Sequence, residues 1–265
     1  MRKENEVAVQ KSKTALFNRE RTELAEVEID LESVIETYRY FREMQLEDSE
    51  LKIPTYRARI PLSDGRAFDI VTGEDGYDTS VTSFRGVVAN FHNCNALFTS
   101  PEPGNEPPVC SSPDGIKGLD VITSEIKDCA SCPNNQWGSG NGSRRGKACK
   151  NMRRLYILVE GFDMPLVMTL PPTSIAGWEM YKSAVLGVRR LSPKEVVTEF
   201  ALSSAINGAG IKYYVVVFKA VGVISGKARE MVEYLGSGEA YDKDVVAEDY
   251  NTVDNTTLAE DEAGN

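Results

Sequence analysis

The sequence predicts a mainly β protein of the α+β class, in which short strands build one core and helices flank it. Segments rich in β-branched and aromatic residues, several of them alternating apolar with polar positions, are typical of strands. The 265 residues are 41% apolar, which is enough to form a core. Pro and Gly gather in one long stretch, residues 93–150, and elsewhere mark turns.

Residues 1–50 form a charged extension that contains one predicted helix. Apolar residues recur every three or four positions across residues 30–46, which is the spacing of a single helical face. We expect this helix to pack on the core or on another copy of the chain. Its apolar positions are Leu31, Val34, Ile35, Tyr38, Phe41 and Met44.

Residues 51–225 form the predicted β domain. Residues 53–62 and 67–73 are expected to form a hairpin, because Asp64 and Gly65 lie between two alternating segments. The other predicted strands are residues 83–92, 153–161, 165–170, 195–203 and 212–224.

Two helices are predicted in the second half of the chain. Residues 175–187 should form a helix with Ser174 or Thr173 as N-cap and Gly187 as its end, and a short helix should cover residues 226–238. Three strand regions, a helix and two more strands follow the order of a five-stranded OB-like barrel, in which a helix links strands 3 and 4. We therefore expect an OB-like barrel with one long insertion.

The insertion at residues 93–150 contains the cysteine pattern. A loop of this length without secondary structure is costly to order, and a bound metal would supply the ordering energy. Cys110, Cys129, Cys132 and Cys149 are separated by 18, 2 and 16 residues. A Cys-x-x-Cys turn directs two thiolates at one ion, and a closed tetrahedral zinc site needs two further ligands. The sequence therefore predicts a structural Zn²⁺ site.

Two alternatives to this ligand set remain open. His92 or Cys94 could replace one of the cysteines, although a strand-end histidine beside a small buried cysteine is the simpler interpretation. A redox role for Cys129 and Cys132 is less favoured, because a thioredoxin-type motif opens a helix whereas Pro133 follows here.

The charge distribution separates the ends of the chain from its centre. Residues 1–50 carry a net charge of −5, residues 51–238 carry +3 and residues 239–265 carry −8. The last segment has few apolar residues, so we expect a disordered acidic tail. No apolar run is long enough for a membrane span or a signal peptide, and five cysteines argue against a disulfide framework, so we expect a cytoplasmic protein.

A basic block directly follows the cysteine pattern. No acidic residue occurs between Cys129 and Glu160, and Trp137 and Tyr156 lie at either end of the block. Such runs are usually solvated faces, but basic residues beside aromatic rings are also typical of single-strand binding, where phosphates contact the cations and bases stack on the rings. The candidate cations are Arg144, Arg145, Lys147, Lys150, Arg153 and Arg154.

The two rings have simpler interpretations as well. Along residues 153–159 Tyr156 alternates onto the same face as Arg154, but it could equally be a half-buried tyrosine of the barrel. Trp137 could be a lid over the metal loop.

The sequence does not contain a complete copy of the enzyme motifs that it partly resembles. Gly146-Lys147 is preceded by Asn141 where a phosphate-binding loop has Gly, and Ala148 stands where that loop has Ser or Thr. The chain has one His, which excludes most hydrolytic mechanisms that use a histidine base. We therefore expect a protein that is not an enzyme.

Four segments resemble a known family: PPVCSSPDG (107–115), CASCPNNQWGSG (129–140), GKACKNMRRLYIL (146–158) and LPPTSIAGWEMY (170–181). They are similar to OB-fold single-stranded-DNA-binding proteins of phages and mobile elements that carry an inserted zinc loop. The resemblance covers roughly residues 50–225. It implies zinc on the four cysteines, coating of single-stranded DNA in replication or recombination, and a location in the cytoplasm of a host bacterium.

The acidic tail at residues 239–265 is similar in character to tails with which single-strand binders recruit replication or recombination proteins. It ends AEDEAGN, without the apolar tip typical of cellular versions. A second hypothesis is a zinc-stapled protein-interaction module that inhibits or modifies a host complex. A nucleic-acid enzyme is a third.

Overall fold

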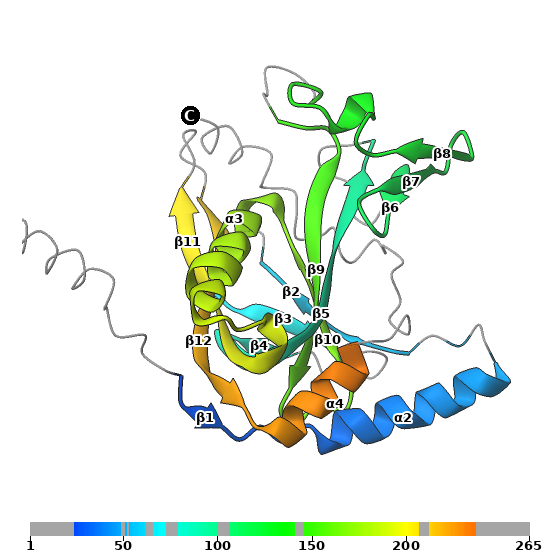
Figure 1. Ribbon diagram of the computed structural model, residues 1–265. Coiled ribbons are helices and arrows are strands. Elements are labelled where there is room, and N and C mark those ends of the chain that lie inside the picture. The colour runs from blue at the N-terminus through cyan, green and yellow to red at the C-terminus, as the bar shows by residue number, and fades with distance from the viewer. Residues whose placement is uncertain are drawn as a thin grey trace, which may run out of the picture.

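A single curled β-sheet forms the centre of this computed structural model (Figure 1). The predicted mainly β class is confirmed, but the described part of the sheet has twelve strands, not five. The residues that the structure describes are 24–48, 51, 53–61, 66–72, 79–99, 107–140, 146–206 and 212–236. The strands are β1 (Glu26–Val27), β2 (Tyr56–Arg59), β3 (Phe68–Val71), β4 (Thr79–Val81), β5 (Ser83–Leu97), β6 (Cys110–Ser112), β7 (Lys117–Asp120), β8 (Glu125–Asp128), β9 (Lys150–Val159), β10 (Leu166–Leu170), β11 (Val196–Ile206) and β12 (Lys212–Ile224).

The strands of the sheet pair in an order that differs from their order along the chain. Their sequence across the sheet is β1-β12-β11-β5-β9-β10-β2-β3-β4, and β6, β7 and β8 branch from β5. β5 is antiparallel to β9 on one side and to β11 on the other. The predicted hairpin is present as β2 and β3, and β2 joins β10 in parallel. The sheet therefore extends well beyond the strands that the barrel prediction needs.

Strand β5 pairs with two neighbours, β9 and β11, and it is irregular where both pairings meet. At Gly86 a Cβ atom would lie 2.6 Å from Ile157 Cγ2 and 2.7 Å from the carbonyl oxygen of Leu158, so any larger residue would force the strands apart. The register with β9 shifts between Val88 and Asn90, which is a β-bulge. Glycines and bulges of this kind allow a strand to curl around a core.

Helix α3 (Pro172–Met180) packs against one face of the curled sheet, and its Trp178 is completely buried there. The helix begins earlier than predicted, so Ser174 is not its cap: the hydroxyl of Ser174 accepts a hydrogen bond from the Val216 N–H at 3.0 Å. The predicted end at Gly187 is close, because a π-helical turn covers Tyr181–Leu186 before a 3₁₀ turn begins.

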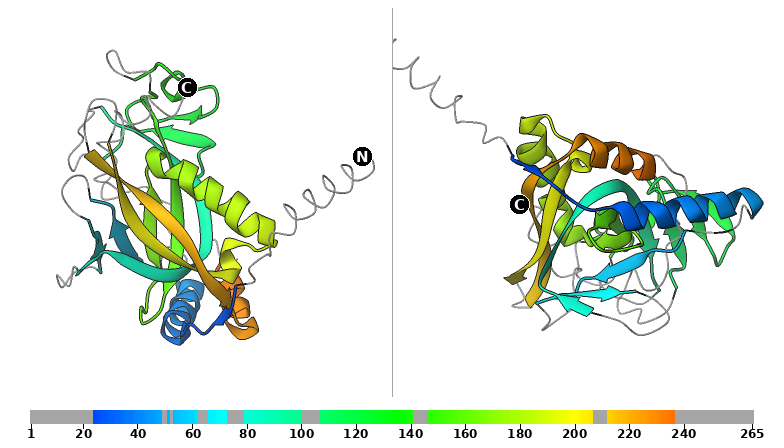
Figure 2. Two further views of the ribbon diagram at one scale, coloured as in Figure 1. Left: turned by 90° about the vertical axis from the view of Figure 1, so that its left-hand side faces the viewer. Right: turned by 90° about the horizontal axis from the view of Figure 1, so that it is seen from below.

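Two further helices, α2 (Glu32–Glu47) and α4 (Gly226–Gly236), cover the opposite face of the sheet. The predicted apolar face of α2 is buried at Leu31, Val34, Ile35 and Tyr38, whereas Met44 is exposed. The carboxyl-terminal part of α2 extends past the sheet, as Figure 1 and the right-hand view of Figure 2 show. None of the described helices is long and apolar enough to cross a bilayer.

The insertion contains more regular structure than predicted. β5 continues to Leu97, and β6, β7 and β8 form a small antiparallel sheet that projects from its end (Figure 1). These strands are three or four residues long and lie among Gly, Pro and Ser, so the sequence carries no periodic signal for them. We call residues 107–140 and 146–149 the cysteine module. The first 23 residues, Arg144, Arg145 and the acidic tail lie outside the described residues.

Candidate metal centre and nucleic-acid interface

The four predicted zinc ligands line one cavity in the cysteine module. Cys110 begins β6, Cys129 follows β8, Cys132 precedes a 3₁₀ turn and Cys149 precedes β9. The cavity has a volume of about 20 Å³. That volume is suitable for a single ion or water and far too small for an organic cofactor.

Backbone hydrogen bonds hold the segments that carry these cysteines. The Cys129 N–H donates to the Ile116 carbonyl oxygen at 2.8 Å, and the Cys149 N–H donates to the Asn134 carbonyl oxygen at 2.8 Å. The side chain of Asn135 donates to the Cys129 carbonyl oxygen at 2.7 Å. The two ends of the module are therefore tied to each other around the cavity.

The wall formed by β7 and β8 is shaped by one glycine and one ion pair. A Cβ at Gly118 would lie 3.0 Å from the Cys110 Sγ, so the absence of a side chain there makes room for the thiol. Asp120 and Lys127 also line the cavity and form an ion pair with each other. The Lys127 ammonium lowers the pKa of Asp120 to about 2, so the pair remains ionised at neutral pH.

The thiols affect one another electrostatically. Burial, followed by the neighbouring Cys129, raises the pKa of Cys149 to about 12. Burial, followed by Asp120 and Cys129, also raises the pKa of Cys110. In the absence of a cation these two thiols keep their protons, and a divalent metal would have to displace them.

The donor set fits a tetrathiolate site in chemistry, size and enclosure. Among the described residues, however, no group of three or more His, Cys, Asp and Glu side chains is already arranged as a metal site. The sulfurs would therefore have to move closer together around an ion. The metal accordingly remains a proposal.

The alternative ligands His92 and Cys94 are not among the residues that line this cavity. Cys94 is fully buried and packs with Ala96 and Met152. The His92 Nε2 lies 3.2 Å from the hydroxyl oxygen of Tyr156. Cys94 matches the simpler interpretation of a small buried cysteine. His92 is not at a strand end as expected, because β5 continues to Leu97.

Trp137 is the exposed ring of the cysteine module. Its side chain is 64% exposed, and the Lys147 Nζ lies 6.0 Å from the ring centroid. The same ammonium lies 3.4 Å from the side-chain oxygen of Asn135. Hydrogen bonds from the N–H groups of Gly138 and Gly140 to the Gly146 carbonyl oxygen, at 3.2 and 3.0 Å, hold the backbone beside Trp137. The Trp137 ring and the Lys147 ammonium group therefore lie close together in the module.

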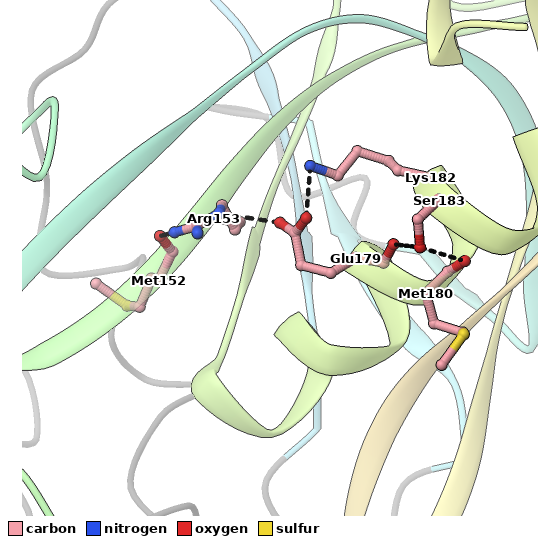
Figure 3. Close-up of polar contacts among 6 residues, drawn as sticks. All are labelled: Met152, Arg153, Glu179, Met180, Lys182 and Ser183. Atoms are coloured by element: carbon pink, nitrogen blue, oxygen red, sulfur yellow. Dashed lines mark hydrogen bonds and ion pairs between the residues drawn. The ribbon is translucent and has the colours of Figure 1, made fainter. Parts of the chain in front are cut away.

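Strand β9 divides the rest of the basic block between two faces of the sheet. Arg153 points toward α3, where its guanidinium lies 3.6 Å from Glu179 (Figure 3). Glu179 also pairs with Lys182 at 2.9 Å, so it bridges two cations (Figure 3). The Lys182 ammonium lies 4.9 Å from the centroid of the Phe91 ring. Arg153 therefore belongs to a network on the α3 side.

Arg154 and Tyr156 share the other face, as their alternation predicts, but both are buried. Their side chains are 2% and 1% exposed, and Lys150 on the same strand is 8% exposed. This burial argues against direct contact with DNA in this conformation, and it corrects the expectation of an open groove. Tyr156 is a buried tyrosine of the sheet, more enclosed than the half-buried position of its alternative interpretation.

The residues across from Arg154 and Tyr156 were not identified from the sequence. His92 on β5 and Thr169 on β10 lie directly beside Arg154. Val167 on β10 lies between Tyr156 and Arg57 of β2, so Arg57 is on the same face of the sheet. The alternation of Arg57 and Arg59 with apolar Ala58 in the first predicted strand was the available signal. A polar and basic stripe thus crosses four strands, with Arg57 and His92 half-buried at its margins.

Comparisons with protein-family models, with curated proteins and with solved structures find no match to this chain.

Proposed function

We propose that this chain binds single-stranded DNA without sequence preference, on a zinc-stapled OB-type barrel, in phage or mobile-element replication or recombination. The strand connectivity supports the barrel. β5 pairs with both β9 and β11, β9 pairs with β10, β11 pairs with β12, and α3 links β10 to β11. This is the order expected of an OB domain, here left open because β10 pairs with β2 and not with β12.

The observation that carries the proposal is the exposed ring of Trp137 with the half-buried Lys147 beside it, in the connection between β5 and β9. In OB domains the connection between the first and second strands helps to bind oligonucleotides. A base stacked on a ring of this kind contributes about 1–3 kcal/mol, and a neighbouring ammonium can contact the phosphate. Arg144 and Arg145 lie between the two residues in sequence and bring two further positive charges to this segment of the chain.

The second part of the proposed interface is the polar stripe on β5, β9, β10 and β2. Arg57 and His92 are accessible at its margins, whereas Arg154 and Tyr156 would reach a strand of DNA only if the face became uncovered. We assign the larger share of binding in this conformation to the module surface around Trp137.

Zinc is proposed as the ion that closes the module. Cys110, Cys129, Cys132 and Cys149 would supply four thiolates, and the ion would join the segments that precede β6 and β9. Zinc quantification on the purified protein tests this, with an expected value of one equivalent. Cys129→Ser should lose the metal, and less than one equivalent in the parent protein would refute the closed site.

A titration with oligo-dT against salt tests the proposed DNA binding. Neutralising about three phosphates with Arg144, Arg145 and Lys147 should give a slope of log affinity against log salt of about −2, since each phosphate on a single strand contributes about −0.7. Trp137 should report binding by fluorescence quenching, because the chain has two tryptophans and Trp178 is fully buried. A flat salt response or a preference for duplex would contradict the proposal.

Lys147→Gln and Lys117→Gln form a matched pair for this titration. Both residues belong to the cysteine module, but Lys117 is exposed on β7. Lys147→Gln should weaken binding and make the slope less steep by about 0.7, whereas Lys117→Gln should leave both unchanged. An equal effect of the two substitutions would mean that general charge, not this surface, controls binding.

The second hypothesis, a protein-interaction module, is favoured by a separate observation. Five aliphatic side chains of the module are about half exposed or more, which is typical of binding surfaces. Charge reversal at Arg144 and Arg145 separates the hypotheses, because it should abolish DNA binding under the first and matter little under the second. These side chains are Ile116, Leu119, Val121, Ile122 and Ile126.

A further inference from the structure

Two apolar side chains are exposed on the surface of the cysteine module that faces away from the thiol cavity. Gly118 and Asp120 of β7 line the cavity, so Leu119 between them points to the opposite face. Ile126 of β8 lies directly across from Leu119 in the register. These two side chains are 49% and 73% exposed. Contiguous apolar groups on a soluble protein usually mark a site of association.

Strand β8 presents this surface along an edge that is open within the described residues, since it pairs only with β7 there. The hydrogen bond from Cys129 N–H to the Ile116 carbonyl oxygen fixes which backbone groups face β7, because these groups alternate along an antiparallel strand. Lys127 and Glu125 therefore direct their N–H and C=O groups toward β7. Ile126 directs its own outward, away from β7, which is the strand that β8 pairs with in the described part of the chain.

This edge is complementary to itself under two-fold rotation. Antiparallel pairing with Ile126 opposite Ile126 of a second copy would let their outward N–H and C=O groups bond to each other. Glu125 of each copy would then lie opposite Lys127 of the other, which places opposite charges together. A shift by one residue would place Glu125 opposite Asp128 and Ile126 opposite Lys127, so one register is strongly preferred.

We propose that the chain associates as a two-fold symmetric homodimer through β8, which joins the two small sheets into one of six strands. The paired Leu119 and Ile126 side chains of both copies would form one continuous apolar face. A closed two-fold contact uses the same patch on both copies, which is what the self-complementary charges of this strand favour. The interface is separate from Trp137 and Lys147, so the proposal does not depend on DNA binding.

Sedimentation equilibrium of the full chain, without nucleic acid and from about 1 to 100 µM, tests the dimer. The unmodified protein should show a concentration-dependent monomer–dimer equilibrium. Ile126→Lys places like charges opposite each other and should raise the dimer dissociation constant at least about tenfold. Ile122→Lys is the matched control, because Ile122 is equally exposed, at 72%, but lies in the turn between β7 and β8. It should leave the dissociation constant unchanged.

Three results would overturn the proposal. These are a monomer at every concentration, a dimer that Ile126→Lys does not weaken, and equal weakening by Ile122→Lys, which would indicate general apolar contact. Glu125→Lys provides a second variant if near-ultraviolet circular dichroism shows that Ile126→Lys is misfolded. It should also weaken the dimer, because like charges would then lie across the two-fold axis, and its failure to do so would exclude the predicted register.

Discussion

The curled sheet and the cysteine module use opposite arrangements of their side chains. In the sheet the large apolar residues are inside, with Trp178 and Phe200 both completely buried. In the module Ile122 and Ile126 are almost three-quarters exposed, and the interior cavity is lined by thiols together with Asp120 and other polar groups. Apolar burial therefore explains the order of the sheet, while the module needs another source of stability, which we propose is the ion.

The comparison predicts that metal removal affects the two regions differently, and this is the largest expected effect. Structural zinc contributes about 10 kcal/mol or more to the folding of small zinc peptides. Cys129→Ser should therefore greatly increase hydrogen exchange of the β7 and β8 amides while the β11 and β12 amides remain protected. Cys94→Ala is the control that should retain the metal, because Cys94 does not line the cavity. Equal loss of protection in both regions would contradict the separation.

The reverse experiment destabilises the core of the sheet and should leave the zinc site of the cysteine module intact. Trp178→Ala removes a completely buried ring and should lower the free energy of unfolding by about 3–5 kcal/mol. Trp137→Ala removes a ring that is 64% exposed, and should change it by less than about 0.5 kcal/mol. Denaturant unfolding measures both, and zinc content of each folded variant should stay at one equivalent. Loss of zinc from Trp178→Ala would show that the module depends on the core.

High pH should destabilise the core in part through Tyr181. Burial raises the pKa of Tyr181 to about 12, while its hydroxyl lies 2.7 Å from the Thr198 hydroxyl oxygen. The unfolded tyrosine ionises near its ordinary pKa of about 10, so stability is complete below that pH and is lost between about 10 and 12, by roughly 1.4 kcal/mol per pH unit at most. Urea unfolding of the parent chain and of Tyr181→Phe should show this loss in the parent chain alone, beyond changes common to both. Parallel curves would contradict the assignment.

The smallest expected effect concerns the Arg153, Glu179 and Lys182 network in Figure 3. The Glu179 side chain is 47% exposed, so water and salt screen both of its ion pairs. Glu179→Gln should lower the free energy of unfolding by less than about 1 kcal/mol, and less at high salt. Glu36→Gln, at an exposed position on α2, provides the reference in thermal unfolding. A loss of several kcal/mol would mean that α3 docks on the sheet mainly through this network.

Periodic signals predicted most of the fold. The α2 pattern, the β2–β3 hairpin and the strands after residue 150 all appear within a few residues of their predicted bounds. The β6, β7 and β8 strands were missed because strands this short form only when neighbouring strands supply their partners. The number of strands was wrong also because β1 and β4, which are two and three residues long, were not predicted. The pairing of β10 with β2 could not be predicted, because it joins segments that are far apart in sequence.

The candidate site was predicted in part. The spacing of Cys110, Cys129, Cys132 and Cys149 correctly indicated residues that meet at one cavity. The alternation of Arg154 with Tyr156 correctly assigned them to one face. Their burial could not be predicted, because it depends on what packs over that face and not on the strand itself.

By itself the sequence determined the class of fold, the helical and strand periodicities and the identity of the thiols, because these depend on local spacing and chemistry. Only the tertiary structure decided which side chains are accessible. Strand β9 sends Arg153 toward Glu179 and buries Arg154, although the two are adjacent in the chain. Exposure is a property of the surfaces that meet across a sheet, and those surfaces come from residues distant in sequence.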